Sequence, residues 1–319
     1  MLDQALRESL VLPAIAAPMT MVSGRELVTE ACRAGIMAGL PRHNFPSSTE
    51  FATALIRIRA DLERHSAEHP GARVGTLAVN ISTRQPVEAI REDLDICAAH
   101  GVQVVISSLG NPAELAKIVH DWGGQIYHDV TTLRFAEKAT TAGVDGLICI
   151  TSGGGGHSGL LSPFVFIPAV REFFDGTIVL AGGISTGAAL RAAEVLGADL
   201  SYLGTRFIAT REANVPQEYR EMLVNATAAD LLYTDRVSAV PANWLVPSLR
   251  SRGLDPADLP MPAGRGNYDH LPAGVRPWRE IWSAGQGVEL IHDAPSVAEV
   301  VARLCQEYRA AARQDAPGC

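Results

Sequence analysis

The sequence predicts an α/β protein of the (β/α)8 TIM-barrel class, with an irregular and helical C-terminal insert that acts as a lid or small subdomain. Three observations predict this fold. Eight short apolar runs occur along the chain, amphipathic segments separate them, and the order helix, glycine, small residue, aspartate, strand occurs in both EKATTAGVDG and AAEVLGADL. Eight strands that each lead into a helix close naturally into a barrel. An open doubly wound sheet would leave two runs unexplained, so we favour the barrel.

The predicted strands are mostly apolar along their whole length and do not alternate between apolar and polar residues. This pattern is typical of parallel strands that are buried on both faces. We place the strands at residues 13–18, 35–40, 73–80, 102–109, 125–130, 146–151, 177–183 and 200–207. The carboxyl ends of these strands should form the mouth of the barrel, where barrel enzymes bind their ligands.

Helices are expected between the strands. Residues 112–122 begin with proline and carry apolar residues at helical spacing. Residues 132–143 and 187–198 each end near a glycine, as helices often do. These segments supply the outer layer that a parallel barrel requires.

After the eighth strand the alternation of apolar runs and amphipathic segments stops, so we expect the chain to have three parts. Residues 1–214 should form the barrel, and residues 215–275, which are rich in proline and turns, should form the insert or lid. Residues 276–319 should form a helical segment that packs on the barrel. Trp244 and Tyr268 lie in the insert, where they either close over a ligand or anchor the insert to the barrel.

Composition limits the partners of this chain. Its 319 residues carry a net charge of −8, which gives no electrostatic reason to bind nucleic acid or an anionic membrane, so we expect a small-molecule substrate. The odd cysteine count without a Cys-x-x-Cys pair, and the absence of a recognisable signal or membrane span, favour reduced thiols and a cytoplasmic location. We expect no metal site. A homodimer is compatible with the sequence, which does not fix the oligomeric state.

Two glycine-rich strand ends favour a phosphate site. AGGISTG follows the seventh strand and LGTRF lies at the eighth, which places Gly182, Gly183, Gly204 and Thr205 together. Glycines let backbone N–H groups approach an anion, and barrels often bind phosphate at strands seven and eight. Tight turns alone would also explain these glycines, but their occurrence at adjacent strands favours phosphate.

The stretch TSGGGGHSG, residues 151–159, follows the sixth strand and presents His157 at the mouth. No helix follows the glycines at once, and no Gly-Lys-Ser is present, so neither nucleotide-binding fingerprint fits. An imidazole can act as a base at neutral pH, so we predict a catalytic or substrate-binding role for His157; hydrogen bonding to a loop carbonyl is the alternative. His128, at the end of the fifth strand, is a second candidate. Capping roles explain Asp129 and Asp145 better than site roles.

These motifs together resemble the nitronate monooxygenase family, formerly called 2-nitropropane dioxygenases, which are FMN-dependent (β/α)8 barrels. The resemblance rests on APM, AVN, GGHSG, AGGISTG, GADLSYLGTRFIATRE and WSAGQGVELI, which occur in the family order and span most of the chain. The chain departs from relatives at Gly153 and Gly154, where they often carry an acidic and a small residue. It also departs at the second strand end, where Arg42, His43 and Asn44 replace a glycine-rich turn and suggest an acidic substrate.

The resemblance implies roles for individual residues. Pro18 and Met19 would lie against the flavin, Asn80 would contact its edge, and His157 would be the base. His128 stands where relatives often carry glutamine near the flavin. The expected cofactor contacts are Pro18, Met19, Thr20, Asn80, His128, Gly155, Gly156, Ala181, Gly182, Gly183, Gly204 and Thr205. The last four of these form the predicted phosphate site.

The resemblance leads to three hypotheses of function. In the first, FMN-dependent oxidation converts a nitronate, or a nitroalkane deprotonated by His157, into a carbonyl compound and nitrite with O2. In the second, the chain is an FMN-dependent NAD(P)H enoyl reductase of the fatty-acid or polyketide type. In the third, it is a barrel that binds a flavin or another phosphorylated ligand without turnover.

Overall fold

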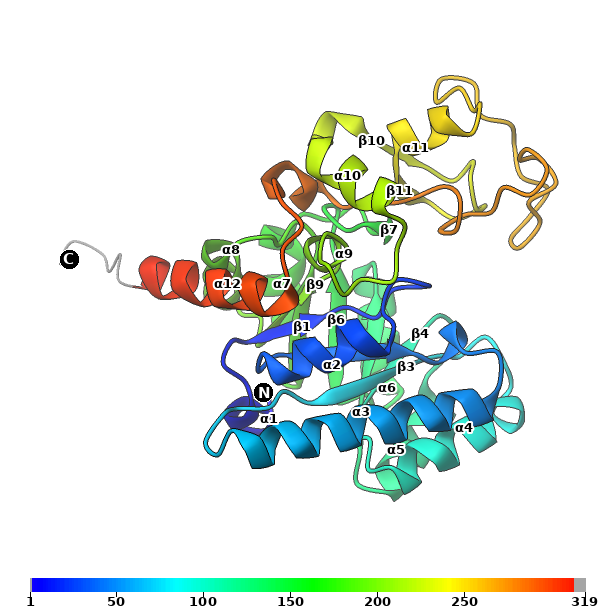
Figure 1. Cartoon of the computed structure of the whole chain (residues 1–319). Helices are drawn as coiled ribbons and strands as arrows, with labels where there is room; N and C mark the ends of the chain where they lie inside the picture. Colours follow the sequence, from blue (N-terminus) through cyan, green and yellow to red (C-terminus); the bar gives the residue numbers. More distant parts are fainter. Residues whose placement is uncertain (1, 313–319) are drawn as a thin grey trace.

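The computed structural model describes residues 2–312 and confirms the closed parallel barrel (Figure 1). Its strands are β1 (Ala14–Ala16), β2 (Met37–Pro41), β3 (Leu77–Ser82), β4 (Val104–Ser108), β5 (Gln125–Val130), β6 (Gly146–Ile150), β8 (Thr177–Ala181) and β9 (Leu200–Leu203). Each strand pairs with the next in this order, and β1 pairs with β9 to close the ring. All eight strands overlap the predicted runs.

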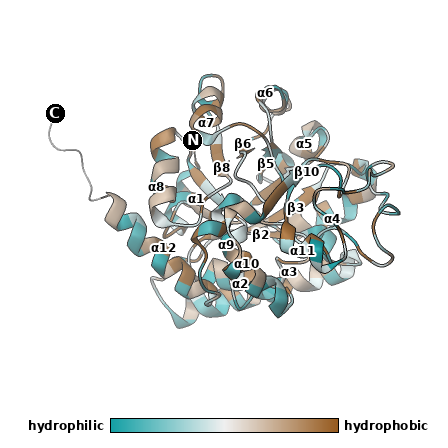
Figure 2. Ribbon diagram, turned by 90° about the horizontal axis from the view of Figure 1, so that it is seen from above, coloured by the Kyte–Doolittle hydropathy of each residue, from teal (hydrophilic) through white to brown (hydrophobic). Residues whose placement is uncertain are grey.

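A ring of helices surrounds the strands, as the view from above shows (Figure 2). The helices that follow the first seven barrel strands are α2 (Arg25–Arg33), α3 (Ser48–Glu68), α4 (Val87–Ala99), α5 (Ala113–Asp121), α6 (Leu133–Thr141), α7 (Pro163–Arg171) and α8 (Gly187–Leu196). Side chains cap some of them: Thr132 accepts from the N–H of Phe135, and Thr186 accepts from the N–H of Ala189. The three helices expected from periodicity therefore form with nearly the predicted bounds.

The amino-terminal end of the barrel is closed by α1 (Gln4–Ser9). Leu6 and its neighbours Leu2 and Leu10 join a buried cluster with Ile15, Tyr127 and other side chains that fill the barrel interior. Because this end is plugged by apolar side chains, a ligand can enter the barrel only from the carboxyl ends of the strands.

The eighth helical position is filled by a segment from the end of the chain. The helix directly after β9, α9 (Thr205–Ile208), has only four residues, whereas α12 (Val297–Ala312) packs against both α8 and α2. The contact between α8 and α12 is close: a Cβ added at Gly187 would lie 2.2 Å from the N of Tyr308. The chain thus leaves the barrel after α9 and returns to complete the helical ring.

Residues 209–296, between α9 and α12, leave the barrel, and we call them the excursion. They contain more regular structure than their prolines suggested. The excursion comprises α10 (Gln217–Asn225), η2 (Ala228–Asp230), β10 (Leu231–Thr234), β11 (Ala242–Leu245), α11 (Val246–Ser251) and η3 (Gln286–Leu290). Its own apolar cluster includes Val237, Trp244 and Ile281. The strands β10 and β11 form an antiparallel sheet whose third strand, β7 (Gly156–His157), belongs to the loop that follows β6.

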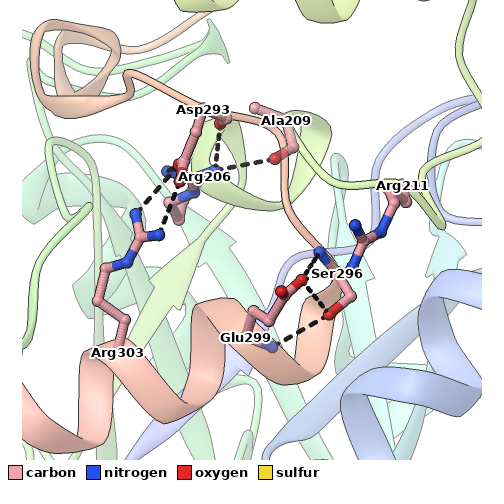
Figure 3. Close-up of polar contacts among 7 residues, drawn as sticks. All are labelled: Arg206, Ala209, Arg211, Asp293, Ser296, Glu299 and Arg303. Atoms are coloured by element: carbon pink, nitrogen blue, oxygen red, sulfur yellow. Dashed lines mark hydrogen bonds and ion pairs between the residues drawn. The ribbon is translucent and has the colours of Figure 1, made fainter.

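Ionic contacts fasten the returning chain to the barrel (Figure 3). The buried side chain of Arg206 donates to the carbonyl oxygens of Ala209 and Asp293, both at 2.8 Å, and Arg303 of α12 pairs with the Asp293 carboxylate at 2.7 Å. Arg303 holds the pKa of Asp293 below its usual value. Arg206, which follows the eighth strand end, therefore points away from the barrel mouth and stabilises the return of the chain.

No helix between residues 2 and 312 is long and apolar enough to cross a membrane. Within the same residues Cys32, Cys97, Cys149 and Cys305 are free thiols, and Cys319 lies outside the described part. Burial raises the pKa of Cys32, Cys97 and Cys149 to about 12, so these buried thiols are protonated and serve as small apolar side chains.

Candidate active site

A cavity of about 1840 Å³ opens at the carboxyl ends of the barrel strands. The predicted base and all the predicted cofactor contacts line it: Pro18, Met19, Thr20, Asn80, His128, Gly155, Gly156, His157, Ala181, Gly182, Gly183, Gly204 and Thr205. These residues come from six different strand ends and are far apart in the sequence. The barrel brings them together because the carboxyl ends of parallel strands meet at one face.

The floor of this cavity is the uppermost layer of inward-facing side chains. Side chains alternate along a strand, so Tyr127 lies in the barrel interior and Asp129, two residues on, lies at the cavity floor. Ala17, Ile150 and Ala181 provide apolar surface at the same level. This level of the cavity therefore combines apolar side chains with the carboxyl group of Asp129, and Tyr202, which packs against the interior cluster, also lines the cavity.

Asp129 is that carboxyl group, and the capping role expected for it is wrong. Its Oδ1 is buried and has no hydrogen-bond partner, whereas Asp145, also expected to cap, does accept from the backbone N–H of Ile126 at 2.8 Å. Burial raises the pKa of Asp129 from 3.8 to about 7. The side chain therefore carries a proton in part of the molecules at neutral pH, and it lines the cavity although its unpaired Oδ1 is itself shielded from solvent.

We expect Asp129→Asn to stabilise the protein at high pH only. The folded-state pKa of Asp129 is raised, so the folded protein holds a proton that the unfolded chain releases, and the stability of the native state declines as pH rises from about 4 through about 7. The variant should match the parent in free energy of unfolding near pH 4 and exceed it above pH 7, by denaturant unfolding. Asp121→Asn, at an exposed site at the end of α5, is the control. An equal difference at both pH values would contradict the assignment.

His128 lies at the cavity wall, buried and fixed by a neighbour. Its Nδ1 lies 2.8 Å from the Oγ of Ser107 on β4, and burial lowers the pKa of His128 to about 4. The ring is therefore neutral at neutral pH and held in one orientation, as a residue that contacts a ligand needs to be.

His157, which follows the neighbouring strand β6, is held at the cavity wall by the antiparallel sheet. In β7 it pairs with Ala242 of β11, its Nε2 lies 3.5 Å from the Oγ of Ser238, and its ring meets the edge of Trp278 at a centroid distance of 5.0 Å. Burial, reinforced by the charges of Arg84 and Arg265, lowers the pKa of His157 to about 4. A neutral imidazole that faces the cavity can accept a hydrogen bond or a proton.

Asn243 on β11 fixes the shape of the loop that carries His157. Its Nδ2 donates to the carbonyl oxygen of Gly154 at 2.7 Å and to the Oγ of Ser158 at 3.2 Å. Asn243 is buried, so these bonds are shielded from water. The stretch 151–159 is consequently a fixed strand and turn, although its four glycines suggest a flexible loop.

The glycines at 153 and 155 are explained by backbone packing between three segments that meet at the cavity edge. The carbonyl oxygen of Gly153 accepts from the N–H groups of Gly183 at 3.1 Å and Gln286 at 3.0 Å. A Cβ added at Gly155 would lie 2.8 Å from the N of Gly285, and one added at Gly285 would lie 2.5 Å from the O of Gly153. We call this contact of residues 153–155, 182–183 and 285–287 the glycine junction. It joins the loops after β6 and β8 to the C-terminal motif WSAGQG.

The predicted phosphate edge is more restricted than the sequence suggested. The N-terminus of α8 already binds an anion of the protein itself, because the N–H of Gly187 donates to Oε2 of Glu307 at 2.7 Å. The hydroxyl of Thr205 accepts from the N–H of Gly285 at 2.9 Å. The backbone groups that remain for a phosphate lie at residues 184–185, ahead of α8, and at residues 204–205, at the start of α9, where Ser185 and Gly204 line the cavity.

The second strand end contributes one residue to the cavity instead of three. His43 lines it, with Nε2 2.9 Å from the Oγ of Thr20. Arg42 instead pairs with Asp93 on α4 at 2.7 Å, and Asn44 holds the loop after β1 by accepting from the N–H of Met21 at 2.7 Å. The expectation that Arg42 attracts an acidic substrate is therefore wrong, because its charge is neutralised within the fold.

Backbone strain is concentrated around the cavity. Within the described chain, four residues other than glycine have left-handed backbone conformations, at Met21, Leu109, Ala239 and Trp278. Leu109 and Trp278 line the cavity, and the other two lie next to residues that do. Such conformations are costly for bulky residues and occur preferentially at functional sites, so their positions support this cavity as the active site.

Of the two roles left open for Trp244 and Tyr268, the structure supports anchoring and not contact with a ligand. Trp244 is fully buried in the core of the insert, and Tyr268 packs against the same core, so both anchor the insert. The cavity wall is formed by Trp278, which lies beyond the range that we expected to act as a lid. Among residues 2–312, no group of three histidine, cysteine or acidic side chains is arranged to hold a metal ion.

The fold and the site together define a barrel of the enzyme type, with a deep ligand cavity at the carboxyl ends of its strands and strained, fixed residues around it. The sequence model of the nitronate monooxygenase family matches residues 52–307. The chain belongs to this family.

One curated relative carries the family name, and two solved structures share the fold. A nitronate monooxygenase of Paraburkholderia phytofirmans is 30% identical over 219 residues, which cover 63% of this chain and 58% of that protein. The structure of a nitroalkane oxidase from Streptomyces ansochromogenes has a TM-score of 0.79 at 24% identity and covers 97% of this chain and 99% of its own. FabK from Thermotoga maritima has a TM-score of 0.76 at 21% identity and covers 98% of both chains. The chain spans about three fifths of the length of the curated relatives it matches.

Proposed function

We propose that this protein is an FMN-dependent oxidoreductase that converts nitronates into carbonyl compounds and nitrite with O2. The observation that carries the proposal is the position of His157, a neutral imidazole fixed between Trp278 and Ser238 at the wall of a cavity that apolar side chains also line. Membership of the nitronate monooxygenase family supports the same reaction class.

The residues of the cavity fit an FMN group. Ala17, Ile150 and Ala181 offer apolar side chains to a flat ring, and Asp129 lines the same cavity. Asn80 donates through Nδ2 to Ile106, which leaves its amide oxygen to accept from the edge of a ring. A Cβ added at Gly183 would meet nothing within 4 Å, so this residue borders open cavity where a phosphate would lie beside residues 184–185 and 204–205. FMN, when bound, supplies the redox chemistry with O2.

His157 would bind the substrate and could accept a proton from it. A base is most effective when its pKa lies near the working pH, and the pKa of His157 is about 4, which makes its imidazole a weak base toward a carbon acid. We therefore propose that the preformed nitronate anion is preferred to the neutral nitroalkane. The charges of Arg84 and Arg265, which lower the pKa of His157, would attract that anion.

The insert would exclude water from the reacting group. The sheet of β10, β11 and β7 holds His157 in place, Trp278 closes one wall, and the hydroxyl of Tyr233 donates to the carbonyl oxygen of Ser158 at 3.2 Å. Exclusion of water strengthens the hydrogen bonds and charges that act on the substrate.

An enoyl reductase is the second candidate, because the enoyl reductase domain of MlnA from Bacillus amyloliquefaciens has the same fold, with a TM-score of 0.70 at 14% identity. The two candidates differ in electron donor. Oxygen uptake with propyl nitronate in the absence of NADPH is the result that we expect. NADPH-dependent reduction of a crotonyl thioester, without oxygen uptake on the nitronate, would replace the first proposal by the second.

The visible spectrum of the purified protein separates both enzymes from a barrel that binds some other phosphorylated ligand. We expect flavin absorbance near about 450 nm and release of FMN on denaturation. A colourless protein that neither binds nor is activated by added FMN would refute both flavin-dependent proposals.

A further inference from the structure

The cavity is larger than FMN and a nitronate require. Ligand sites for one drug-sized molecule occupy roughly 300–1000 Å³, whereas this cavity has about 1840 Å³. FMN is one molecule of that size, and a small nitronate adds only a few atoms. The cavity extends along α6, where Arg134, Phe135 and Lys138 line it, and Asn111, Ala142 and Leu160 are also on its wall. We call this part the α6 arm.

The charge of the cavity wall opposes the charge of the whole protein. The chain carries a net charge of −8, yet Arg84, Arg134, Lys138 and Arg265 all line the cavity, and its sole acidic lining residue is the floor residue Asp129. Between residues 2 and 312, none of these four cations forms an ion pair, although arginines elsewhere do. Cations left unpaired along one cavity favour an anionic ligand with several charges.

Apolar side chains accompany these cations. Phe135 is 52% exposed and Leu160 is 75% exposed, and both line the cavity. Arg134 and Lys138 are four residues apart on α6 and therefore share one face of the helix, with Phe135 beside them. Exposed apolar groups next to unpaired cations suit a ligand that carries a flat ring close to its phosphates.

We propose that the α6 arm binds an adenosine diphosphate group of a second ligand, in which Arg134 and Lys138 bind the phosphates and Phe135 and Leu160 contact the adenine. Such a group occurs in CoA thioesters and in nicotinamide dinucleotides, and either would extend from the arm toward the floor of the cavity. This inference rests on the proposed function, because it assumes that FMN occupies the floor.

The two lysines of the chain allow a direct test in the native protein. Lys138 lies in the arm, and Lys117, exposed on α5, does not line the cavity. The flavin-loaded protein is treated with an amine-reactive reagent in the presence of ADP, CoA or NADPH, and modification at each lysine is followed by mass spectrometry. We expect the probes to slow modification of Lys138 several-fold and to leave Lys117 unchanged. Stronger protection by CoA than by NADPH identifies a thioester, and the reverse identifies a dinucleotide.

Substitution gives the second measurement. Lys138→Glu should weaken binding of the protecting probe by about tenfold at low salt, because an attractive contact becomes a repulsive one. Lys117→Glu makes the same charge change outside the cavity and should leave binding unchanged. Equal modification of both lysines with and without every probe, or equal effects of both substitutions, would overturn the proposal.

The test of the α6 arm can fail or succeed independently of the test of the proposed function. Unprotected Lys138 in a protein that contains FMN and oxidises nitronates overturns only the arm. Protected Lys138 in a protein that contains no FMN supports the arm and contradicts the proposed function.

Discussion

His157→Ala is expected to lower kcat/KM for a neutral nitroalkane by about 10²- to 10⁴-fold, the range associated with loss of a positioned acid–base group, and to lower it less for a preformed nitronate, which needs no deprotonation. The substitution removes the imidazole that faces the cavity but not the backbone pairing of β7 with Ala242. The loop should therefore keep its shape and the protein should keep its FMN. The measurements are steady-state oxygen uptake and the ratio of flavin to protein absorbance.

His292→Ala is a suitable control for this variant, because His292 is exposed in the coil after η3 and does not line the cavity. The control should keep full activity. Unchanged turnover in His157→Ala would remove His157 from the mechanism, and loss of FMN would assign it a structural role instead.

The pH profile adds a further readout for the same residue. Burial lowers the pKa of His157 from 6.5 to about 4, so the ring should stay neutral down to that pH in the absence of substrate. Protonation of this group should reduce kcat/KM only as pH falls toward about 4. A limb of the profile centred near the ordinary histidine pKa and abolished by His157→Ala would contradict the burial of the ring.

The second large effect is expected for Gly155→Val, which should abolish stable FMN binding and lower the melting temperature. A Cβ at this position would lie 2.8 Å from the N of Gly285 and 2.9 Å from the C of Ala284, both backbone atoms that cannot move aside as a side chain could. Overpacking costs about 1–3 kcal/mol in ordinary cores, and here it would also separate the loops at the cavity edge.

Gly264→Val is the matched control, since an added Cβ there meets nothing within 4 Å. Thermal unfolding and flavin content should be unchanged in this variant. A Gly155→Val protein with the melting temperature and flavin content of the parent would show that the glycine junction can separate at little cost.

The barrel could be predicted from the sequence because its signal is local. Each of the eight strands is a short apolar run, and the helices between them repeat apolar residues at helical spacing, so neighbouring residues carry the information. The thirteen predicted site residues line one cavity because strand ends are also local features, and the barrel closure then fixes their meeting point. Their individual roles stay predictions.

The features that were missed depend on contacts between distant residues. His157 pairs with Ala242, eighty-five positions later, and a pair of residues in a glycine-rich run gives no strand signal of its own. Trp278 contacts His157 in β7, whereas Trp244 lies in the core of the insert. The composition of the insert does not reveal which tryptophan makes which contact. The position of Asp129 could have been predicted from the sequence. Side chains alternate along a strand, so a residue two positions after the interior residue Tyr127 faces the cavity.

The return of α12 to the helical ring has a consequence for synthesis of the protein. During translation the barrel strands and the insert emerge before the helix that occupies the gap between α8 and α2 and that supplies Glu307 to the N–H of Gly187. Domains generally begin to fold from the amino-terminal side as the chain emerges. A nascent chain that stops short of α12 would thus display two unpaired apolar helix faces, so premature termination yields a product marked for aggregation or proteolysis and not a partly active enzyme.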